Sequence, residues 1–502
     1  MSVLQRRAFL ASTAAGLGLS GVLQSLGPLS AAEVTLGPGI ARFSSDIEPL
    51  VRFLEETPQE TIIEATAGKV KAGLSYRELL AALLLAGVRN IEPRPSVGFK
   101  FHAVLVVNSA HLASISSANE DRWLPLFWAI DNFKRSQARD VREGNWTLPA
   151  VDEAALPTAT QAAGSLREAL DAWDESAADA AITSLVRNAG ANRVFELLAA
   201  YAARDFRSIG HKVIYLSNAF RTLQTIGWEY AEPVMRSLVY AMLNHHGEPN
   251  PGSSDLAADR PGRFNREQLA TLNAPLVSGA ADDVATRDLV RSLHDCSPTE
   301  ASEQVAELLR RKISVQSLWD AMFAASGELM MRQRGIVSLH AVTTANAIHY
   351  AYQNAADEQT RKYLLLQNAS FLPMFRDAAS RRGTLGDARI DELGSAAPAD
   401  QVASIPDVFE TMGKSRPQAS RQMYELLAAG GDPQAVVDHA RRLVFLKGND
   451  SHDYKFSSAA LEDYRVLSPD WRNRFLAASA YQLCSPAEAT RPLVQRIQSA
   501  IG

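Results

Sequence analysis

The stretch YRELLAALLLAGVRNI, from Tyr76 to Ile91, decides the fold class of this chain. Its apolar residues recur at three- and four-residue spacing, which is the period of an α-helix. The same pattern returns in RVFELLAAYAARDF (Arg193 to Phe206) and in EPVMRSLVYAMLNHH (Glu232 to His246). The sequence contains neither an Asn-Gly hairpin turn nor a ladder of short alternating strands. We therefore predict an all-α protein whose many helices pack like a bundle.

Length and internal pattern favour one large domain. The 502 residues suffice for one large core or for two or three ordinary domains. No repeat of about 34 or about 40 residues indicates a solenoid. Two polar stretches, 247–254 and 383–405, have the composition of long loops, which either separate domains or decorate one. We expect a single helical domain over residues 33–502.

Composition excludes some classes of partner and covalent framework. Hydrophobic residues make up 46% of the chain, and the net charge is −5. Because no long basic run accompanies this charge, we expect no nucleic-acid partner. Cys296 and Cys484 are too few for a disulfide framework and too far apart for a zinc knuckle. They form either one disulfide in an oxidising compartment or two buried free thiols.

The N-terminus predicts export from the cytoplasm. Arg6 and Arg7 precede Phe9-Leu10 and a mildly apolar run, and this order resembles a twin-arginine signal that is cleaved after Ala32. A short N-terminal anchor helix is the alternative interpretation. No later segment offers the ~20 unbroken apolar residues of a membrane-spanning helix. We therefore expect residues 1–32 to be removed and the twin-arginine translocon to be a partner during export. We expect the mature chain to lie in the periplasm or otherwise outside the cytoplasm, without a membrane span.

Four of the ten histidines begin four separate apolar segments, and such residues can converge inside a bundle to bind a metal. They are His102, His211, His340 and His452. His111 and His349 each follow one of them by nine residues, which turns a helix by about half a revolution beyond two turns, so they should face elsewhere. His452 and Lys455 are three residues apart and share a helix face. For each histidine the alternative is a hydrogen-bonded core residue, and for Lys455 a solvated side chain. The pair His245-His246 fits a helix end, where a cation is favourable.

The segments around these four histidines resemble, in order, those of the questin-oxidase-like family known from fungal anthraquinone pathways. The segments are FKFHAVLVV, IGHKVIYLSNAF, SLHAVTTANAIHY and SHDYKFSSAAL, and the resemblance runs from about Phe99 to Leu461. The chain departs from the family where Tyr215 replaces a second histidine, where Val107-Asn108 replaces a histidine pair, and where Ser458 stands near the family's arginine.

The resemblance implies an iron-dependent oxygenase that acts on an aromatic or polyketide-like small molecule with O2. It implies a mononuclear non-haem Fe(II) site whose ligands are His102, His211, His340, His452 and a carboxylated Lys455. An ammonium group has no lone pair for a metal. The carbamate that a neutral amine forms with carbon dioxide is an anionic oxygen ligand, and burial favours the neutral amine.

Other residues and cofactors follow from the same interpretation. Tyr215, Asn346, Trp228 and Tyr454 are candidates to support the ligands or line the pocket, with ordinary packing as the alternative. NADPH is a conceivable co-substrate, although no Gly-x-Gly-x-x-Gly fingerprint supports it, and no Cys-x-x-Cys-His motif predicts haem. The rival hypotheses are a metal-dependent enzyme without redox chemistry and a non-catalytic helical binding protein whose histidines belong to the core.

Overall fold

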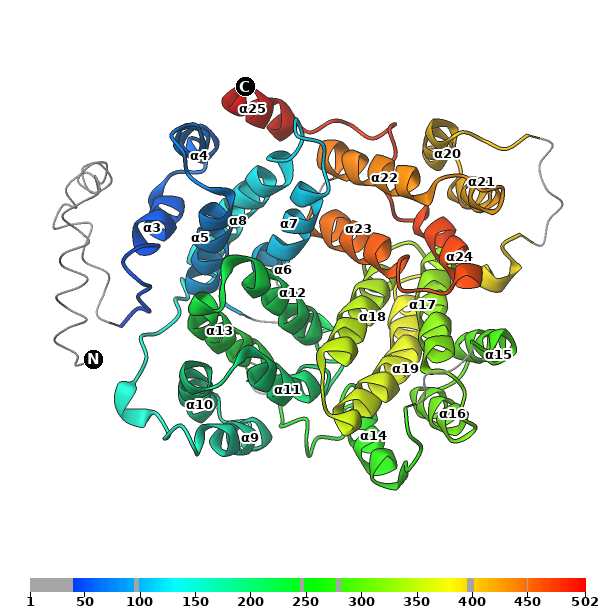
Figure 1. Cartoon of the computed structure of the whole chain (residues 1–502), viewed down its shortest axis with the longest axis horizontal. Coiled ribbons are helices and arrows are strands. Elements are labelled where there is room, and N and C mark those ends of the chain that lie inside the picture. Colours follow the sequence, from blue (N-terminus) through cyan, green and yellow to red (C-terminus); the bar gives the residue numbers. More distant parts are fainter. Residues whose placement is uncertain (1–38, 94–98, 244–247, 277–280, 395–400, 449) are drawn as a thin grey trace, which may run out of the picture.

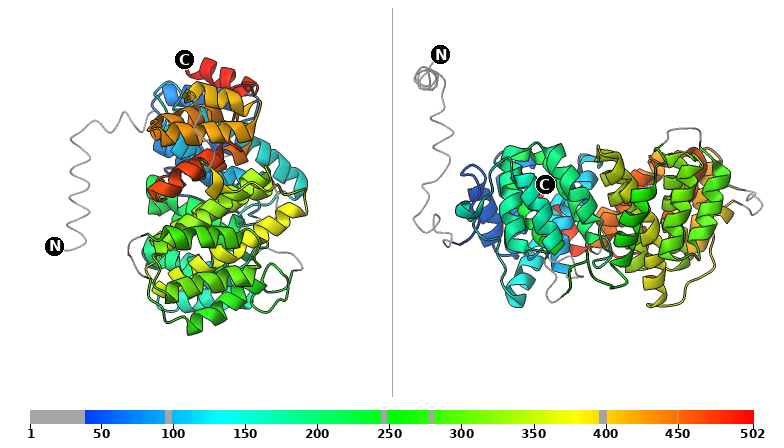
Figure 2. Two further views of the ribbon diagram at one scale, coloured as in Figure 1. Left: turned by 90° about the vertical axis from the view of Figure 1, so that its right-hand side faces the viewer. Right: turned by 90° about the horizontal axis from the view of Figure 1, so that it is seen from below.

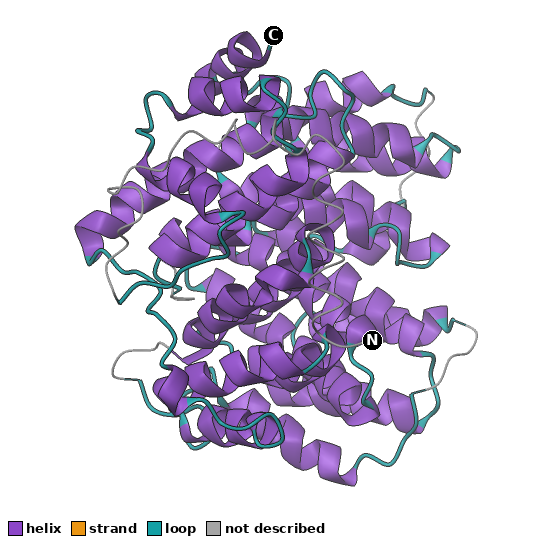
Figure 3. Cartoon of the chain, turned by 60° about the vertical axis from the view of Figure 1, so that its left-hand side comes forward, coloured by secondary structure: helices purple, strands orange, loops and turns teal. Residues whose placement is uncertain are grey.

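The structure is a computed structural model that describes residues 39–93, 99–243, 248–276, 281–394, 401–448 and 450–502. Within these ranges the regular structure is helical, and the bridge between Ile40 and Pro149 is the sole β pairing. The all-α prediction is therefore confirmed, and Figure 3 shows helices throughout the molecule. The predicted signal segment and the pair His245-His246 lie outside the described residues.

The chain follows a circuit around the molecule, which the colours of Figure 1 trace from blue to red. The first part contains α3 (Glu48–Glu56), α4 (Ile62–Lys71), α5 (Tyr76–Asn90), η2 (Phe99–Phe101), α6 (His102–Leu105), α7 (Val107–Ile115), α8 (Leu124–Glu143) and η3 (Glu153–Ala155). The second contains α9 (Ala162–Ala172), α10 (Glu175–Asn188), α11 (Ala191–Ala202), α12 (His211–Ile226), η4 (Trp228–Tyr230) and α13 (Ala231–Leu243).

The second half of the circuit returns to the starting point. Its first helices are α14 (Arg260–Thr271), α15 (Asp283–Leu293), α16 (Pro298–Arg310), α17 (Val315–Arg332), α18 (Ile336–Asn354) and α19 (Glu358–Ser380). The remaining elements are η5 (Ile390–Glu392), α20 (Ile405–Met412), α21 (Arg416–Ala428), α22 (Pro433–Lys447), α23 (Ser451–Asp463), α24 (Pro469–Ser479) and α25 (Pro492–Ile501). The last helix, α25, packs against α4 and α8 at one end of the molecule (Figure 2). Its Arg496 binds Glu64 of α4 at 2.7 Å, so the two ends of the described chain are joined.

Helices α5 and α18 form the inner part of the fold. Ser75 caps α5 by accepting a hydrogen bond from the backbone of Glu78, whose carboxylate accepts one from Ser75. Residues 79–89 of α5 are all buried, as expected of a helix that other helices surround. Helix α18 is likewise buried over most of its length and packs against α12, α17, α19 and α23. One continuous apolar core, from Ile47 to Ile497, runs through the described helices, which therefore form one compact domain.

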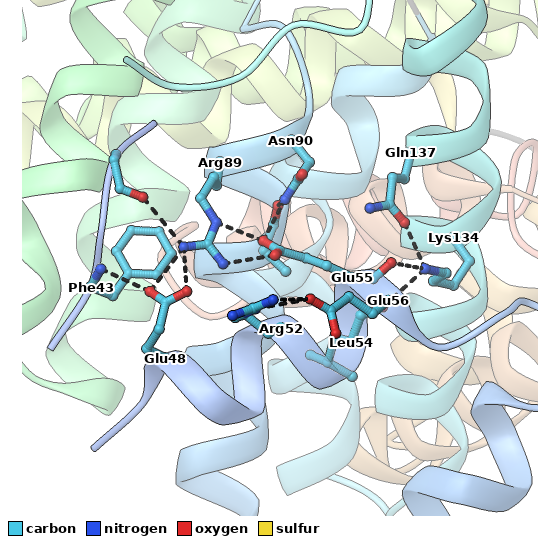
Figure 4. A network of polar contacts seen from close by, with 12 residues as sticks. Phe43, Glu48, Arg52, Leu54, Glu55, Glu56, Arg89, Asn90, Lys134 and Gln137 are labelled. Atoms are coloured by element: carbon cyan, nitrogen blue, oxygen red, sulfur yellow. Dashed lines mark hydrogen bonds and ion pairs between the residues drawn. The ribbon is translucent and has the colours of Figure 1, made fainter. Parts of the chain in front are cut away.

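A buried ionic network fixes α3 against α5 (Figure 4). The guanidinium of Arg89 lies 2.7 Å from Glu48 and 2.7 Å from Glu55, both on α3. Lys134 of α8 donates to the backbone carbonyls of Leu54 and Glu55. Three helices from the first part of the chain are therefore held together by charged groups as well as by apolar packing.

Two remaining expectations concern the cysteines and the membrane. Cys296 is half-buried and Cys484 is buried, and both are free thiols. Of the two alternatives from the sequence, the structure therefore has the free thiols. No helix within the described ranges is long and apolar enough to cross a membrane.

Candidate metal centre

A tight turn places His211 at the first position of α12. Ile209 and Gly210, which precede it, have φ angles of 43° and 82°, in the left-handed region. A Cβ atom at residue 210 would overlap the side chain of Thr344 on α18, so only glycine fits. The turn therefore brings the start of α12 against α18, near the middle of the molecule in Figure 1.

Backbone carbonyls orient two of the histidine rings. His211 Nδ1 lies 2.7 Å from the carbonyl oxygen of Ser208, and His340 Nδ1 lies 2.6 Å from that of Ile336, one turn earlier on α18. A carbonyl oxygen only accepts hydrogen bonds, so each Nδ1 carries a proton and donates it. The Nε2 atom of each neutral ring therefore keeps its lone pair, as in histidines that bind metals.

Three of the four predicted histidines meet at one point. His211 Nε2 lies 3.1 Å from His102 Nε2 and 3.0 Å from His340 Nε2. The possible ligand atoms of these three buried residues all lie within 4.8 Å of one another. We call His102, His211 and His340 the histidine triad. It is a set of donors that can hold a metal ion.

The nitrogens of the triad face one another in a way that a bound cation would stabilise. Burial, with the nearby positive charge of Lys455, holds the pKa of His211 well below the usual 6.5. Burial and the charges of His211 and Lys455 do the same for the pKa of His340. Both rings are therefore neutral at pH 7, and two Nε2 lone pairs stand 3.0 Å apart with no proton to share. A metal ion between them turns this repulsion into two bonds.

The spacing also fits a metal. With metal–nitrogen bonds of about 2.1 Å, two imidazole nitrogens that bind one ion at a right angle lie about 3.0 Å apart. The two Nε2 separations in the triad are 3.1 and 3.0 Å. The donor set and its spacing therefore both fit a single transition-metal ion, and imidazole suits iron, zinc, copper and nickel.

His452 flanks the triad from α23. Its ring centroid lies 4.7 Å from that of His102 and 5.2 Å from that of His340. Its Nδ1 lies 3.1 Å from Asp450, which also caps α23 by accepting a hydrogen bond from the backbone of His452. A carboxylate that accepts a hydrogen bond from Nδ1 fixes the orientation of the ring and leaves the lone pair on Nε2, on the opposite side. Metal-binding histidines are commonly oriented in this way. Asp450 is not among the residues predicted from the sequence, although its position two residues before His452 is that of a helix cap.

Lys455 is buried on the same helix, one turn after His452. Its side chain is 3% exposed, and within the described residues its Nζ has no hydrogen-bond partner. Burial lowers the pKa of Lys455 to about 7, so a large share of the amine is neutral at physiological pH. The charge of Lys455 lowers the pKa of all three histidines of the triad. Of the five predicted ligands, the structure brings the ligand atoms of His102, His211 and His340 together, and His452 and Lys455 lie on α23, whose His452 ring flanks this group.

The other buried histidines face elsewhere. For His349 this is what the nine-residue spacing on α18 predicts, whereas His111 lies on α7 and His102 on the separate helix α6. His111 lies 3.1 Å from the Tyr76 hydroxyl and 3.3 Å from that of Thr225. His349 packs edge-on against Trp319, with ring centroids 4.7 Å apart. Both are ordinary core histidines, which makes them natural controls for the cluster.

The candidate supporting residues lie in different places. Asn346 donates to Glu462 and Asp463 and lines the same small cavity as Lys455. The hydroxyl of Tyr215 donates to Ser237, on the side of α13. Two more side chains pack on aromatic neighbours: Tyr454 on Trp128, and Trp228 on Phe220 beside a different cavity.

Three cavities each touch at least one of the five predicted ligands. A cavity of about 20 Å³, which is room for one small molecule of solvent size, touches Lys455 and is also lined by Arg221, Asn346 and Glu462. Two larger ones, of about 260 and 300 Å³, open to solvent and both touch His452, and the first of them also touches His102. The five predicted ligands are thus buried, and these cavities touch His102, His452 and Lys455 but neither His211 nor His340.

Comparisons of this chain with models of known protein families, with curated proteins and with solved structures find no match.

Proposed function

We propose that this protein is a metalloenzyme with a mononuclear non-haem Fe(II) site, and that it uses O2 to oxidise a small molecule. The observation that carries the proposal is the convergence of the Nε2 lone pairs of His211 and His340, 3.0 Å apart on rings that backbone carbonyls hold in place. A core histidine normally satisfies its nitrogens with unlike partners, so this arrangement favours a metal site over simple packing.

Each residue of the cluster has a part in this proposal. The triad and His452 hold the metal through neutral imidazoles, and Asp450 orients His452. Lys455, as a carbamate, supplies an anionic oxygen that balances part of the metal charge. Ferrous iron, when bound, supplies the one-electron chemistry that lets O2 react with an organic molecule. The burial of the cluster limits the access of water.

The donor set also favours a second candidate function. Three histidines with an open position are the ligands of catalytic zinc in enzymes that activate water. Among the described residues, the triad is the one group of three or more histidines, cysteines or carboxylates placed to hold a metal ion. A zinc enzyme without redox chemistry is therefore the alternative, and the identity of the bound metal distinguishes the two.

Metal analysis tests the proposal. The full chain, purified after expression with its N-terminus intact, should contain close to one iron per chain or take it up under anaerobic conditions. The double variant His340→Ala, His452→Ala should lose the metal. The variant His349→Ala removes another buried histidine from α18 and should keep it.

Three results would contradict the proposal in different ways. Stoichiometric zinc that iron does not replace would favour the second candidate. Bound iron without O2 consumption towards any substrate would contradict the oxygenase activity but not the iron site. Equal metal content in the double variant and in His349→Ala would show that the histidine cluster does not hold the metal.

A further inference from the structure

The cavity of about 260 Å³ that touches His102 and His452 has an unusual lining. Every described residue that lines it is polar or charged: Lys100, His102, Asn132, Arg135, Ser136, Arg139, Asp450, Ser451 and His452. A purely apolar molecule that entered here would remove water from these groups without replacing their hydrogen bonds, which is costly. The lining therefore favours a ligand that carries polar groups, with room for an apolar part against the carbon atoms of the same side chains.

Two arginines one turn apart on α8 dominate this lining. Arg135 and Arg139 share a helix face, and their side chains are 49% and 41% exposed. The ion pair of each with a carboxylate runs through Nε: Arg135 meets Asp131 at 3.1 Å, and Arg139 meets Glu143 at 2.6 Å. Neither guanidinium donates a hydrogen bond from its terminal nitrogens to another described residue. These nitrogens carry most of the N–H donors of the side chain.

The other charges near the cavity are already engaged. Lys100 lies 2.8 Å from Asp140 and 3.2 Å from Glu92. Asp450 is the one carboxylate in the described lining, and it binds His452. The arginine pair is thus the part of the lining that is ready to bind a ligand.

We propose that this cavity admits the substrate and that the substrate carries an oxyanion, a carboxylate or a phosphate, bound by Arg135 and Arg139. Planar guanidinium groups match both anions with paired hydrogen bonds. The rest of the molecule then extends towards His102 and His452, at the inner end of the same cavity. This inference rests on the proposed function and names the substrate class of that site. It narrows the expected aromatic or polyketide-like small molecule to one that carries a carboxylate or a phosphate.

Calorimetric titration of the full chain with benzoate, with inorganic phosphate and with neutral benzamide tests the inference. The protein is titrated both metal-free and metal-loaded. At least one anion should bind, at least about tenfold more tightly than benzamide, because each charge-assisted hydrogen bond favours the anion. The variant Arg135→Gln, Arg139→Gln should bind that anion at least about tenfold more weakly. The tighter of the two anions identifies a carboxylate or a phosphate.

A matched control is Arg310→Gln on α16. Arg310 is 45% exposed and also meets a carboxylate of its own helix, Glu307, but it does not line the cavity. The Arg310→Gln variant should bind the anion as tightly as the parent does. Benzamide binding as tightly as benzoate, unchanged binding in the double arginine variant, or no binding of either anion would each overturn the inference.

The two proposals fail separately. If the protein takes up no metal but still binds the anion through the two arginines, the anion-binding proposal is supported and the metalloenzyme proposal is contradicted. Stoichiometric iron with anion binding independent of the arginines would do the reverse.

Discussion

At the scale of single residues, the pair of Asp450 and His452 links helix capping to the metal centre. Asp450 caps α23 and also contacts His452 Nδ1 at 3.1 Å. Asparagine caps a helix about as well as aspartate but lacks the negative charge that makes the imidazole a stronger ligand.

We therefore expect Asp450→Asn to leave the helix intact and to weaken metal binding by about tenfold or more. Competition with a chelator measures the affinity, and circular dichroism checks the fold. Asp432→Asn is the control, since Asp432 caps α22 in the same way without a histidine ring on its carboxylate. An equal effect of both substitutions on metal affinity would contradict the role of Asp450.

Lys455 gives a prediction for pH dependence. Its pKa in the folded protein is about 7, below the 10.5 of an exposed lysine, because burial disfavours the ammonium. Between these pH values the unfolded chain binds more protons than the folded one, so stability rises with pH. The slope that Lys455 contributes is up to about 1.4 kcal/mol per pH unit.

The free energy of unfolding of metal-free protein in CO2-free buffer should therefore rise more steeply from pH 7 to pH 10 in the parent than in Lys455→Met. Denaturant titration at each pH measures it. Lys414→Met, at an exposed lysine, should keep the slope of the parent. Parallel curves for the parent and Lys455→Met would show that this amine is not buried in its neutral form.

At the scale of elements, the turn before α12 decides where His211 lies. Gly210 combines a left-handed φ of 82° with a close approach to Thr344. The contact joins the start of α12 to α18, the helix that carries His340. The position of the triad therefore depends on a residue that has no side chain of its own.

We expect Gly210→Ala to lower both stability and metal affinity, since the new Cβ must push α12 away from α18. Gly430→Ala is the control, because Gly430 has a similar φ of 87° but no atom within 4 Å of an added Cβ. Gly430→Ala should cost about 1 kcal/mol of stability and no metal affinity. Thermal unfolding and metal titration of both variants separate the backbone cost from the steric one.

At the scale of the whole molecule, the network around Arg89 holds the beginning of the described chain in place (Figure 4). Arg89 is 1% exposed and forms ion pairs with both Glu48 and Glu55. Burial already raises the pKa of Glu55 even though Arg89 lowers it. Without the guanidinium, two carboxylates would be left at a buried interface.

Arg89→Met should therefore lower the free energy of unfolding by about 3–5 kcal/mol, the usual cost of removing one partner of a buried ion pair. Arg52→Met removes an arginine of α3 whose partner Glu56 is 59% exposed, and it should cost less than about 1 kcal/mol. Denaturant unfolding measures both. A small effect of Arg89→Met would mean that apolar packing alone fixes α3.

The sequence by itself determined the fold class and the candidate site residues. The apolar spacing in segments such as Tyr76 to Ile91 predicts helices, because helical periodicity is a local property of the chain. Local geometry also separated His340 from His349, since residues nine apart on one helix face opposite sides, whereas His102 and His111 lie on two helices, α6 and α7, and their separation comes from the break between them. The structure confirms the helical class and the separation of His340 from His349.

Only the tertiary structure decided how the helices meet. His102, His211 and His340 are far apart in the chain, and their Nε2 atoms come within 3.1 Å of a neighbour because helix packing aligns the starts of α6, α12 and α18. The orientation of the rings by Ser208 and Ile336, and the arginine-lined cavity beside His452, depend on the same packing. The physical reason is that spacing along one helix fixes which face a side chain takes, whereas contacts between helices are set by the whole core.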